Sequence, residues 1–366
     1  MTGDPFALQT YSLLDDEDCE ARIRAAKEAL GERLVILGHH YQREEVYRHA
    51  DYTGDSLKLS RLAAASHARY IVFCGVHFMA EVADILSRPD QIVVLPDLAA
   101  GCSMADMASL AKVERAWSEL SAVLDPDAHI TPVTYINSAA DLKAFCGRHG
   151  GIVCTSTNAR DVLEWSFRRR EKVLFFPDQH LGRNTGHRMG IDPEQMVVWD
   201  FDRPLGGLTE ARIRAARIIL WKGFCSVHQM FRPAHIDAFK ERFPDAKVIS
   251  HPECSFEVCE KSDFVGSTEF IIKTVAESAP GTRWLVGTEL NLVERLNTQF
   301  RDEGKSAHFM SPTVCMCSTM FRIDPQHLAW TLENLARDRV VNRIQVPPAT
   351  ADQARVALER MLKVSP

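Results

Sequence analysis

Residues 217–228 read Arg-Ile-Ile-Leu-Trp-Lys-Gly-Phe-Cys-Ser-Val-His, and this stretch sets a pattern that recurs along the chain. An apolar run typical of a buried strand ends in a glycine, and Cys225 and His228 follow it. Two other apolar runs lead in a similar way to Cys102 and to Cys317. Ligands bind outside the carboxyl ends of strands in open α/β sheets. We therefore expect the three cysteines to meet at one point and to hold a metal cluster.

Strand-like and helix-like segments alternate along most of the sequence. Apolar runs such as 34–38, 70–74 and 152–154 are each followed by a polar loop and a helix-like segment. This alternation predicts an α/β fold with parallel sheets made of right-handed βαβ units. Each third of the chain holds about three such units and ends on a strand that leads to a cysteine. We therefore expect three similar three-layer αβα domains in a pseudo-threefold arrangement around a central active site.

The expected domain boundaries follow from this triplication. The first domain is expected over residues 1–115, with C-terminal helices within 318–366 that pack back on it. The second domain is expected over 116–228 and the third over 229–317. The second should also contain an insertion at about 183–214, rich in Gly, Arg and Asp, which we interpret as a long or lid-like loop with one short strand.

Composition and charge narrow the class of protein. Hydrophobic residues make up 46% and charged residues 25% of the chain, which is typical of a globular protein. The net charge of −6 gives no general basic surface, so nucleic-acid binding has little support. No apolar run has the length of a membrane span, and the first residues do not resemble a signal peptide, so a cytoplasmic location is expected. In that reducing compartment, ten cysteines indicate metal binding or catalysis rather than disulfides, although a single cysteine is often only a small buried apolar residue.

Nearly every predicted strand end carries hydroxyl, amide or imidazole groups. These candidate residues are His39, Tyr41, Ser56, Tyr135, Asn137, Ser156, Thr157, His251, Glu253, Ser267 and Thr268. A single Ser-Thr pair before a helix is most simply a cap. Two such pairs in different thirds of the chain favour anion sites, because a helix start offers N–H groups beside the hydroxyls. The expected ligand is a small polyanion with carboxylate or phosphate groups.

Two histidine motifs in this set differ in what they predict. His39 and His40 are adjacent on an extended segment and point opposite ways, so at most one faces the expected centre. In His251-Pro252-Glu253 the alternation places both ionisable groups on one face. A salt-bridged surface pair is the alternative, and the strongly apolar run before it disfavours that reading.

Common cofactor and nucleophile motifs are absent from the sequence. It contains no Gly-rich dinucleotide fingerprint, no Walker-type loop, no nucleophile elbow and no zinc-finger cysteine spacing. Three isolated cysteines suit a [4Fe–4S] cluster whose fourth iron has no protein ligand and binds substrate oxygen as a Lewis acid. Two alternatives are a zinc- or iron-dependent lyase of phosphorylated sugars and a non-catalytic iron–sulfur sensor. The many polar strand ends argue against the sensor.

Short segments between residues 35 and 320 carry a resemblance to one family. They are Gly38-His-His-Tyr-Gln, Gly54-Asp-Ser-Leu, Phe73-Cys-Gly-Val-His-Phe-Met-Ala-Glu, Gly101-Cys-Ser-Met-Ala-Asp, Thr134-Tyr-Ile-Asn-Ser, Cys154-Thr-Ser, Pro177-Asp-Gln-His-Leu-Gly, Gly223-Phe-Cys-Ser-Val-His, His251-Pro-Glu-Cys and Gly266-Ser-Thr. Together they resemble the quinolinate synthase A family, the iron–sulfur enzymes of the de novo NAD pathway. The resemblance implies a transferase that condenses iminoaspartate (iminosuccinate) with dihydroxyacetone phosphate to quinolinate, with release of phosphate and water. It also implies a functional link to L-aspartate oxidase or aspartate dehydrogenase.

The resemblance also assigns roles to residues of this sequence. The cluster ligands would be Cys102, Cys225 and Cys317, with Cys315 as a rival because the third motif matches only in its first half. The catalytic residues would be Tyr41, Tyr135, His228 and Glu253. The substrate-binding residues would be His39, Ser56, Tyr135, Ile136, Asn137, Ser156, His251, Pro252, Glu253, Ser267 and Thr268.

Overall fold

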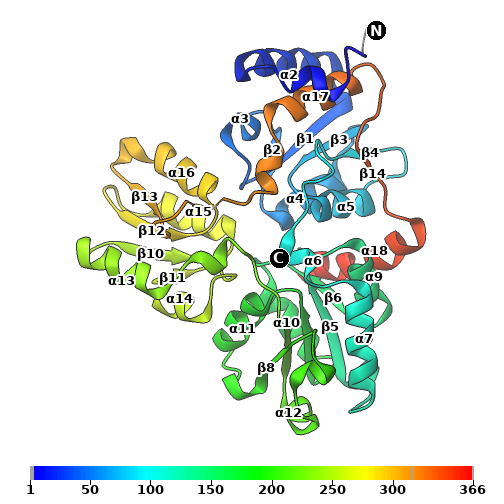
Figure 1. Cartoon of the computed structure of the whole chain (residues 1–366), viewed down its shortest axis with the longest axis vertical. Helices are drawn as coiled ribbons and strands as arrows, with labels where there is room; N and C mark the ends of the chain where they lie inside the picture. The colour runs from blue at the N-terminus through cyan, green and yellow to red at the C-terminus, as the bar shows by residue number, and fades with distance from the viewer. Residues whose placement is uncertain (1–3, 315, 365–366) are drawn as a thin grey trace. The chain divides into compact units, whose positions relative to one another are not determined.

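The structure, a computed structural model, describes residues 4–314 and 316–364 (Figure 1). These residues divide into two compact units. The first unit comprises residues 4–102 together with 316–346, and the second comprises 103–314 together with 347–364. None of the described helices combines the length and apolar character that crossing a bilayer requires.

The first unit is built on one mainly parallel sheet of order β14-β4-β3-β1-β2. Its strands are β1 (Leu34–His39), β2 (Tyr52–Gly54), β3 (Tyr70–Cys74), β4 (Ile92–Val94) and β14 (Arg343–Ile344), of which β14 alone is antiparallel to its neighbour β4. Every residue of β1 and β3 is buried, as expected for central strands covered on both faces. Its α-helices are α1 (Leu8–Tyr11), α2 (Asp16–Leu30), α3 (Glu44–Tyr47), α4 (Ser56–Ala65), α5 (His77–Leu86) and α17 (Pro325–Leu335). Helices α2 and α17, far apart in sequence, pack side by side (Figure 1).

The second unit contains two sheets, and all strand pairs in both are parallel. One sheet has the order β6-β5-β7-β9-β8, with β5 (Ile130–Tyr135), β6 (Ile152–Cys154), β7 (Lys172–Phe176), β8 (Met196–Trp199) and β9 (Ile218–Trp221). The other has the order β11-β10-β12-β13, with β10 (Lys247–Ser250), β11 (Phe264–Val265), β12 (Arg283–Gly287) and β13 (Ser306–Phe309).

Helices connect the strands of both sheets in this unit. Around the first sheet, the helices α6 (Ser103–Asp106), α7 (Leu110–Ser121) and α8 (Pro126–His129) precede β5 in the chain. Between its strands follow α9 (Ala140–Arg148), α10 (Ala159–Phe167), α11 (Gln179–Arg188) and α12 (Glu210–Ala215), and α18 (Pro348–Val364) comes last. In the second sheet, α13 (Pro233–Arg242) precedes β10, and α14 (Phe256–Lys261), α15 (Thr268–Glu277) and α16 (Leu290–Gln299) connect successive strands. Helices α9 and α10 lie on opposite faces of the first sheet, as right-handed crossovers in opposite directions require (Figure 1).

The predicted fold class is confirmed, because the chain forms three sheets dominated by parallel strands with helices between them. The three-domain boundaries and the pseudo-threefold arrangement stay predictions.

Two sequence-based expectations need correction. The segment 183–214 is not a lid-like loop: α11 ends within it, β8 is an edge strand parallel to β9, and α12 follows. Residues 318–366 do not all pack on the first unit, because α18 packs against α9 of the second unit (Figure 1). The close approach requires a glycine, since a Cβ on Gly147 would lie 2.0 Å from the carbonyl oxygen of Gln353.

Candidate active site

Glu253 is the acidic residue on which several predicted site residues converge. It follows β10, and only 4% of its surface is exposed. Tyr135, the last residue of β5, donates a hydrogen bond from Oη to Oε1 of Glu253 at 2.6 Å. The other carboxylate oxygen, Oε2, lies 2.9 Å from Nδ1 of His228. Because β5 and β10 belong to different sheets, the carboxyl ends of two parallel sheets meet at this carboxylate.

Two imidazole rings complete the surroundings of Glu253. The rings of His228 and His251 stack with their centroids 4.8 Å apart. Nδ1 of His251 lies 3.9 Å from Oε1 of Glu253 and accepts a hydrogen bond from the Glu253 backbone N–H at 3.3 Å. The two ionisable groups of the His251-Pro-Glu253 motif are therefore close together, but a turn after β10 brings them together and not the predicted alternation along a strand.

Burial and these contacts set the charges of the group. Burial lowers the pKa of His251 to about 3, against an opposing effect of the nearby Glu253 carboxylate. Burial alone would raise the pKa of Glu253, but His228, His251 and the Tyr135 hydroxyl together lower it to about 2. At neutral pH the site thus holds an ionised carboxylate beside a neutral His251 imidazole.

Asp178 is a second buried acid in this region that the sequence analysis did not single out. It is fully buried and caps α11, with Oδ1 accepting from the His180 backbone N–H at 2.8 Å. Burial and then the nearby Glu253 charge raise its pKa well above the ordinary value. Two carboxyl groups whose pKa values are pushed apart are typical of acid–base sites. The available signal for Asp178 was its place in the Pro177-Asp-Gln-His motif, directly after an apolar run.

The loop after β5 holds Tyr135 in place. The Ile136 backbone N–H donates to the carbonyl of the last residue of β6 at 2.8 Å. Ser138 Oγ donates to the Tyr135 carbonyl at 2.8 Å, and the fully buried Lys143 donates from Nζ to the Ser138 carbonyl. Within the described part of the chain, Oδ1 of the half-buried Asn137 has no hydrogen-bond partner. These hydrogen bonds fix the position of the loop, which presents a buried acceptor that a ligand can satisfy.

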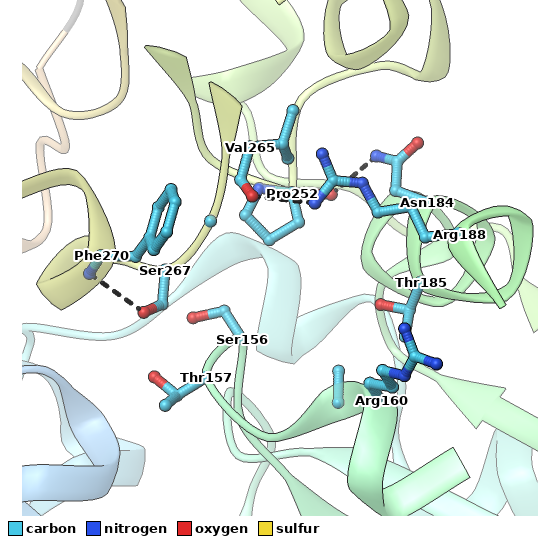
Figure 2. Close-up of a pocket in the computed structure, with 12 residues that line it drawn as sticks. Ser156, Thr157, Arg160, Asn184, Thr185, Arg188, Pro252, Val265, Ser267 and Phe270 are labelled. Atoms are coloured by element: carbon cyan, nitrogen blue, oxygen red, sulfur yellow. Dashed lines mark hydrogen bonds between the residues drawn. The ribbon is translucent and has the colours of Figure 1, made fainter. Parts of the chain in front are cut away.

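A cavity of about 350 Å³ lies in the same unit between elements of both sheets (Figure 2). Four residues singled out from the sequence line it, namely Ser156, Thr157, Pro252 and Ser267. Ser267 caps α15, accepting from the Phe270 backbone N–H at 3.4 Å, and Thr268 is the buried first residue of that helix.

The remaining predicted binding and catalytic residues belong to the first unit. His39 ends β1, and its Nδ1 accepts a hydrogen bond from the Tyr41 backbone N–H at 3.1 Å. The rings of these two residues meet edge to face at 4.7 Å. His40 instead lies with Nδ1 3.1 Å from the Tyr47 hydroxyl. Ser56 is the first residue of α4. The structure therefore brings His39 and Tyr41 together.

The cysteines differ in exposure in a way that fits the predicted metal ligands. Cys102, Cys225 and Cys317 are partly exposed, whereas the other described cysteines are buried. Burial raises the pKa of the buried thiols, for example to about 12 in Cys74, so these thiols stay protonated. Metal ligation requires the thiolate, which partly exposed cysteines form more readily. The rival ligand Cys315 lies outside the described residues.

One of these cysteines also belongs to a compact group of metal-ligating side chains. One ligand atom each from Cys225, His228 and Glu253 lies within 4.8 Å of the others. This group fits a single metal ion, and Cys225 also fits a cluster to which other cysteines contribute.

Comparisons with known proteins identify the family of the chain. The family described as "Quinolinate synthetase A protein" matches residues 21–363. The chain is 56% identical to a quinolinate synthase of Rhodopirellula baltica, over 98% of this chain and 93% of that protein. It is 53% identical to a quinolinate synthase of Acidobacterium capsulatum, over 99% of this chain and 97% of that protein, and 57% identical to one of a Nocardioides species, over 93% and 88%. The chain therefore belongs to the quinolinate synthetase A family and is an enzyme of that family.

Proposed function

We propose that the chain condenses iminoaspartate with dihydroxyacetone phosphate to quinolinate, with release of phosphate and water, in the cytoplasmic synthesis of NAD. The observation that carries the proposal is the buried contact of Tyr135 and His228 with the ionised Glu253. An imine substrate requires a reaction that oxidises aspartate, so L-aspartate oxidase or aspartate dehydrogenase would supply it.

We propose that three cysteines hold a [4Fe–4S] cluster. The proposed ligands are Cys102, Cys225 and Cys317, and their partial exposure among otherwise buried thiols supports the choice. When bound, the cluster supplies an iron without a protein ligand, which eases loss of a substrate hydroxyl as water.

The residues around Glu253 are proposed to carry out the proton transfers. A carboxylate with a pKa of about 2 is a weak base by itself, but it orients His228 through Nδ1. The close contact of a carboxylate oxygen with Nδ1 favours the proton on that nitrogen, so the other nitrogen can exchange a proton with substrate. Tyr135 holds Glu253 through its hydroxyl, and Tyr41, packed on His39, is the second proposed proton donor.

Substrate binding is proposed for the polar strand ends. The orphaned Oδ1 of Asn137 needs a donor, which the imine nitrogen of iminoaspartate provides. Carboxylate or phosphate groups of the substrates suit the hydroxyl groups and N–H groups at the start of α15. The proposed set is His39, Ser56, Tyr135, Ile136, Asn137, Ser156, His251, Pro252, Glu253, Ser267 and Thr268.

A second candidate function has one observation in its favour. The group of Cys225, His228 and Glu253 also suits a single zinc or iron ion, as in a metal-dependent lyase of phosphorylated sugars. Metal analysis of anaerobically purified protein separates the two, since a cluster gives about four irons and four sulfides per chain.

The substitution Glu253→Gln tests the catalytic assignment. It keeps the shape of the side chain and removes the charge that orients His228, so turnover at saturating substrate should fall by about 10² to 10⁴. The control is Glu257→Gln on the exposed face of α14, which should leave turnover unchanged. Iron and sulfide content should match the wild type in both variants. Unchanged quinolinate formation in Glu253→Gln contradicts the assignment.

A further inference from the structure

Two guanidinium groups line the cavity of Figure 2 and have no part in the chemistry proposed above. Arg160 is the second residue of α10, and Arg188 is the last residue of α11. Both residues are exposed. Figure 2 shows them on one side of the cavity, with the hydroxyl groups of Ser156 and Ser267 on the other. The cavity lining therefore combines two guanidinium groups with several hydroxyl groups, one of which, on Thr185, lies beside Arg160.

Both arginines keep donors for a ligand. Arg160 forms an ion pair from Nε to Glu164 Oε1 at 3.1 Å, and both side chains of this pair are well exposed, which makes it weak. Arg188 donates from Nη1 to the Val265 carbonyl at 2.8 Å, which anchors the side chain across the cavity. Arg188 forms no ion pair with any residue in the described part of the chain. Each guanidinium thus has at least one terminal amino group that can still donate.

The remaining lining favours an anion as well. Among the described residues, no acidic side chain lines the cavity. The first turns of α10 and α15 both contribute to its wall through Ala159 and Ser267, and helix starts favour negative charge. Arginine forks, hydroxyls and helix starts in one small cavity are the donor set typical of phosphate recognition. The volume is at the lower end of ligand cavities, so it suits a small phosphorylated molecule.

We propose that Arg160 and Arg188 form a phosphate-docking subsite that takes the phosphate group of the triose phosphate before condensation. The identity of the ligand rests on the proposed function, whereas the anion chemistry does not. The same subsite would also suit inorganic phosphate leaving as product. Both sources share one chemistry, a phosphate dianion held by guanidinium and hydroxyl donors.

Kinetics of the cluster-loaded enzyme test the subsite. Each of Arg160→Gln and Arg188→Gln should raise the KM for dihydroxyacetone phosphate about fivefold, the upper end of the effect of one exposed charge contact, and the double variant about twentyfold. The kcat and the KM for iminoaspartate should not change. The control is Arg168→Gln at the other end of α10, outside the cavity lining, which should leave all constants unchanged.

Calorimetric titration with inorganic phosphate gives a readout that does not depend on turnover. The double variant of Arg160 and Arg188 should bind phosphate about twentyfold more weakly than the Arg168→Gln control. Added salt should weaken binding to the wild type more than to the double variant, because two charge contacts are screened. Wild-type protein that binds phosphate through these arginines but makes no quinolinate would refute the proposed function and keep the subsite.

The two possible ligands, substrate dihydroxyacetone phosphate and product inorganic phosphate, give different outcomes in these experiments. A raised KM for dihydroxyacetone phosphate assigns the subsite to substrate docking. Unchanged KM with weaker product inhibition by phosphate supports the anion site and assigns it to product release. Variants with wild-type KM and wild-type phosphate affinity overturn the proposal, whatever their kcat.

Discussion

Removal of one hydroxyl group, by Tyr135→Phe, tests how Glu253 is held. The hydroxyl donates to Oε1 at 2.6 Å, and the two residues are only 5% and 4% exposed. The phenyl ring fills the same space, so the change removes the hydrogen bond with little loss of packing. The contact of His228 with Oε2 remains, so the buried carboxylate keeps one partner.

The structure sets the size of the effect. Hydrogen bonds to charged groups contribute about 1.5–3 kcal/mol, and we expect the free energy of unfolding to fall by about 2 kcal/mol. Because the lost hydrogen bond stabilises the ionised carboxylate, its removal raises the pKa of Glu253 from about 2 to roughly 3.5. Glu253 thus stays ionised at pH 7.5, so any loss of rate comes from misplacement and not from protonation. We expect kcat to fall at least about tenfold.

The assay is urea unfolding at pH 5 and pH 8 together with steady-state kinetics. A carboxylate with a depressed pKa stabilises the fold above its unfolded pKa of about 4.5 and loses this contribution as the pH falls through its folded value. The difference between wild type and variant should therefore be the same at pH 5 and pH 8. The control is Tyr52→Phe, because Tyr52 is 52% exposed.

Two results would refute this reasoning. One is a loss of stability below about 0.5 kcal/mol, the range of ordinary surface changes. The other is a wild-type kcat, which would mean that Tyr135 does not position Glu253 for chemistry.

Three further predictions concern stability and packing. Between pH 7.5 and pH 5 the wild type should lose about 2 kcal/mol more stability than His251→Gln, because His251 has a pKa of about 3 when folded and 6.5 when unfolded. Equal urea midpoint shifts in both proteins over this pH range would contradict this. Asn184→Ala should lower the free energy of unfolding by about 2–3 kcal/mol, because Nδ2 donates to the buried Pro252 carbonyl at 2.8 Å; an unchanged thermal midpoint would argue against it. Gly147→Ala should expose α18 to limited proteolysis, because its Cβ would lie 2.0 Å from the Gln353 carbonyl oxygen; wild-type resistance would show that α18 does not depend on this contact.

Much of the fold could be predicted from local patterns. The apolar runs that became β1, β3 and β7 carry enough residues to show that they are buried. The strands β2 and β14 have three and two residues, too few for a period, and β14 is defined only by pairing with β4. Long-range pairing of this kind leaves no local signal.

The residues of the candidate site could be predicted where a reactive side chain directly follows a strand. Tyr135, His251 and Glu253 stood out as polar residues after apolar runs, but their mutual contacts join segments 118 residues apart. Arg160 and Arg188 gave no signal, since an arginine on a helix is usually solvated and only the cavity shows what they face.

The most direct test of the account is iron and sulfide analysis of protein purified without air, with single substitutions of the proposed ligands. We predict about four irons and four sulfides per chain in the wild type and in the control Cys19→Ala, whose thiol is buried in α2. The variants Cys102→Ala, Cys225→Ala and Cys317→Ala should each lose the cluster. A single metal ion per chain, or a full cluster in any of these three variants, would contradict the central claim.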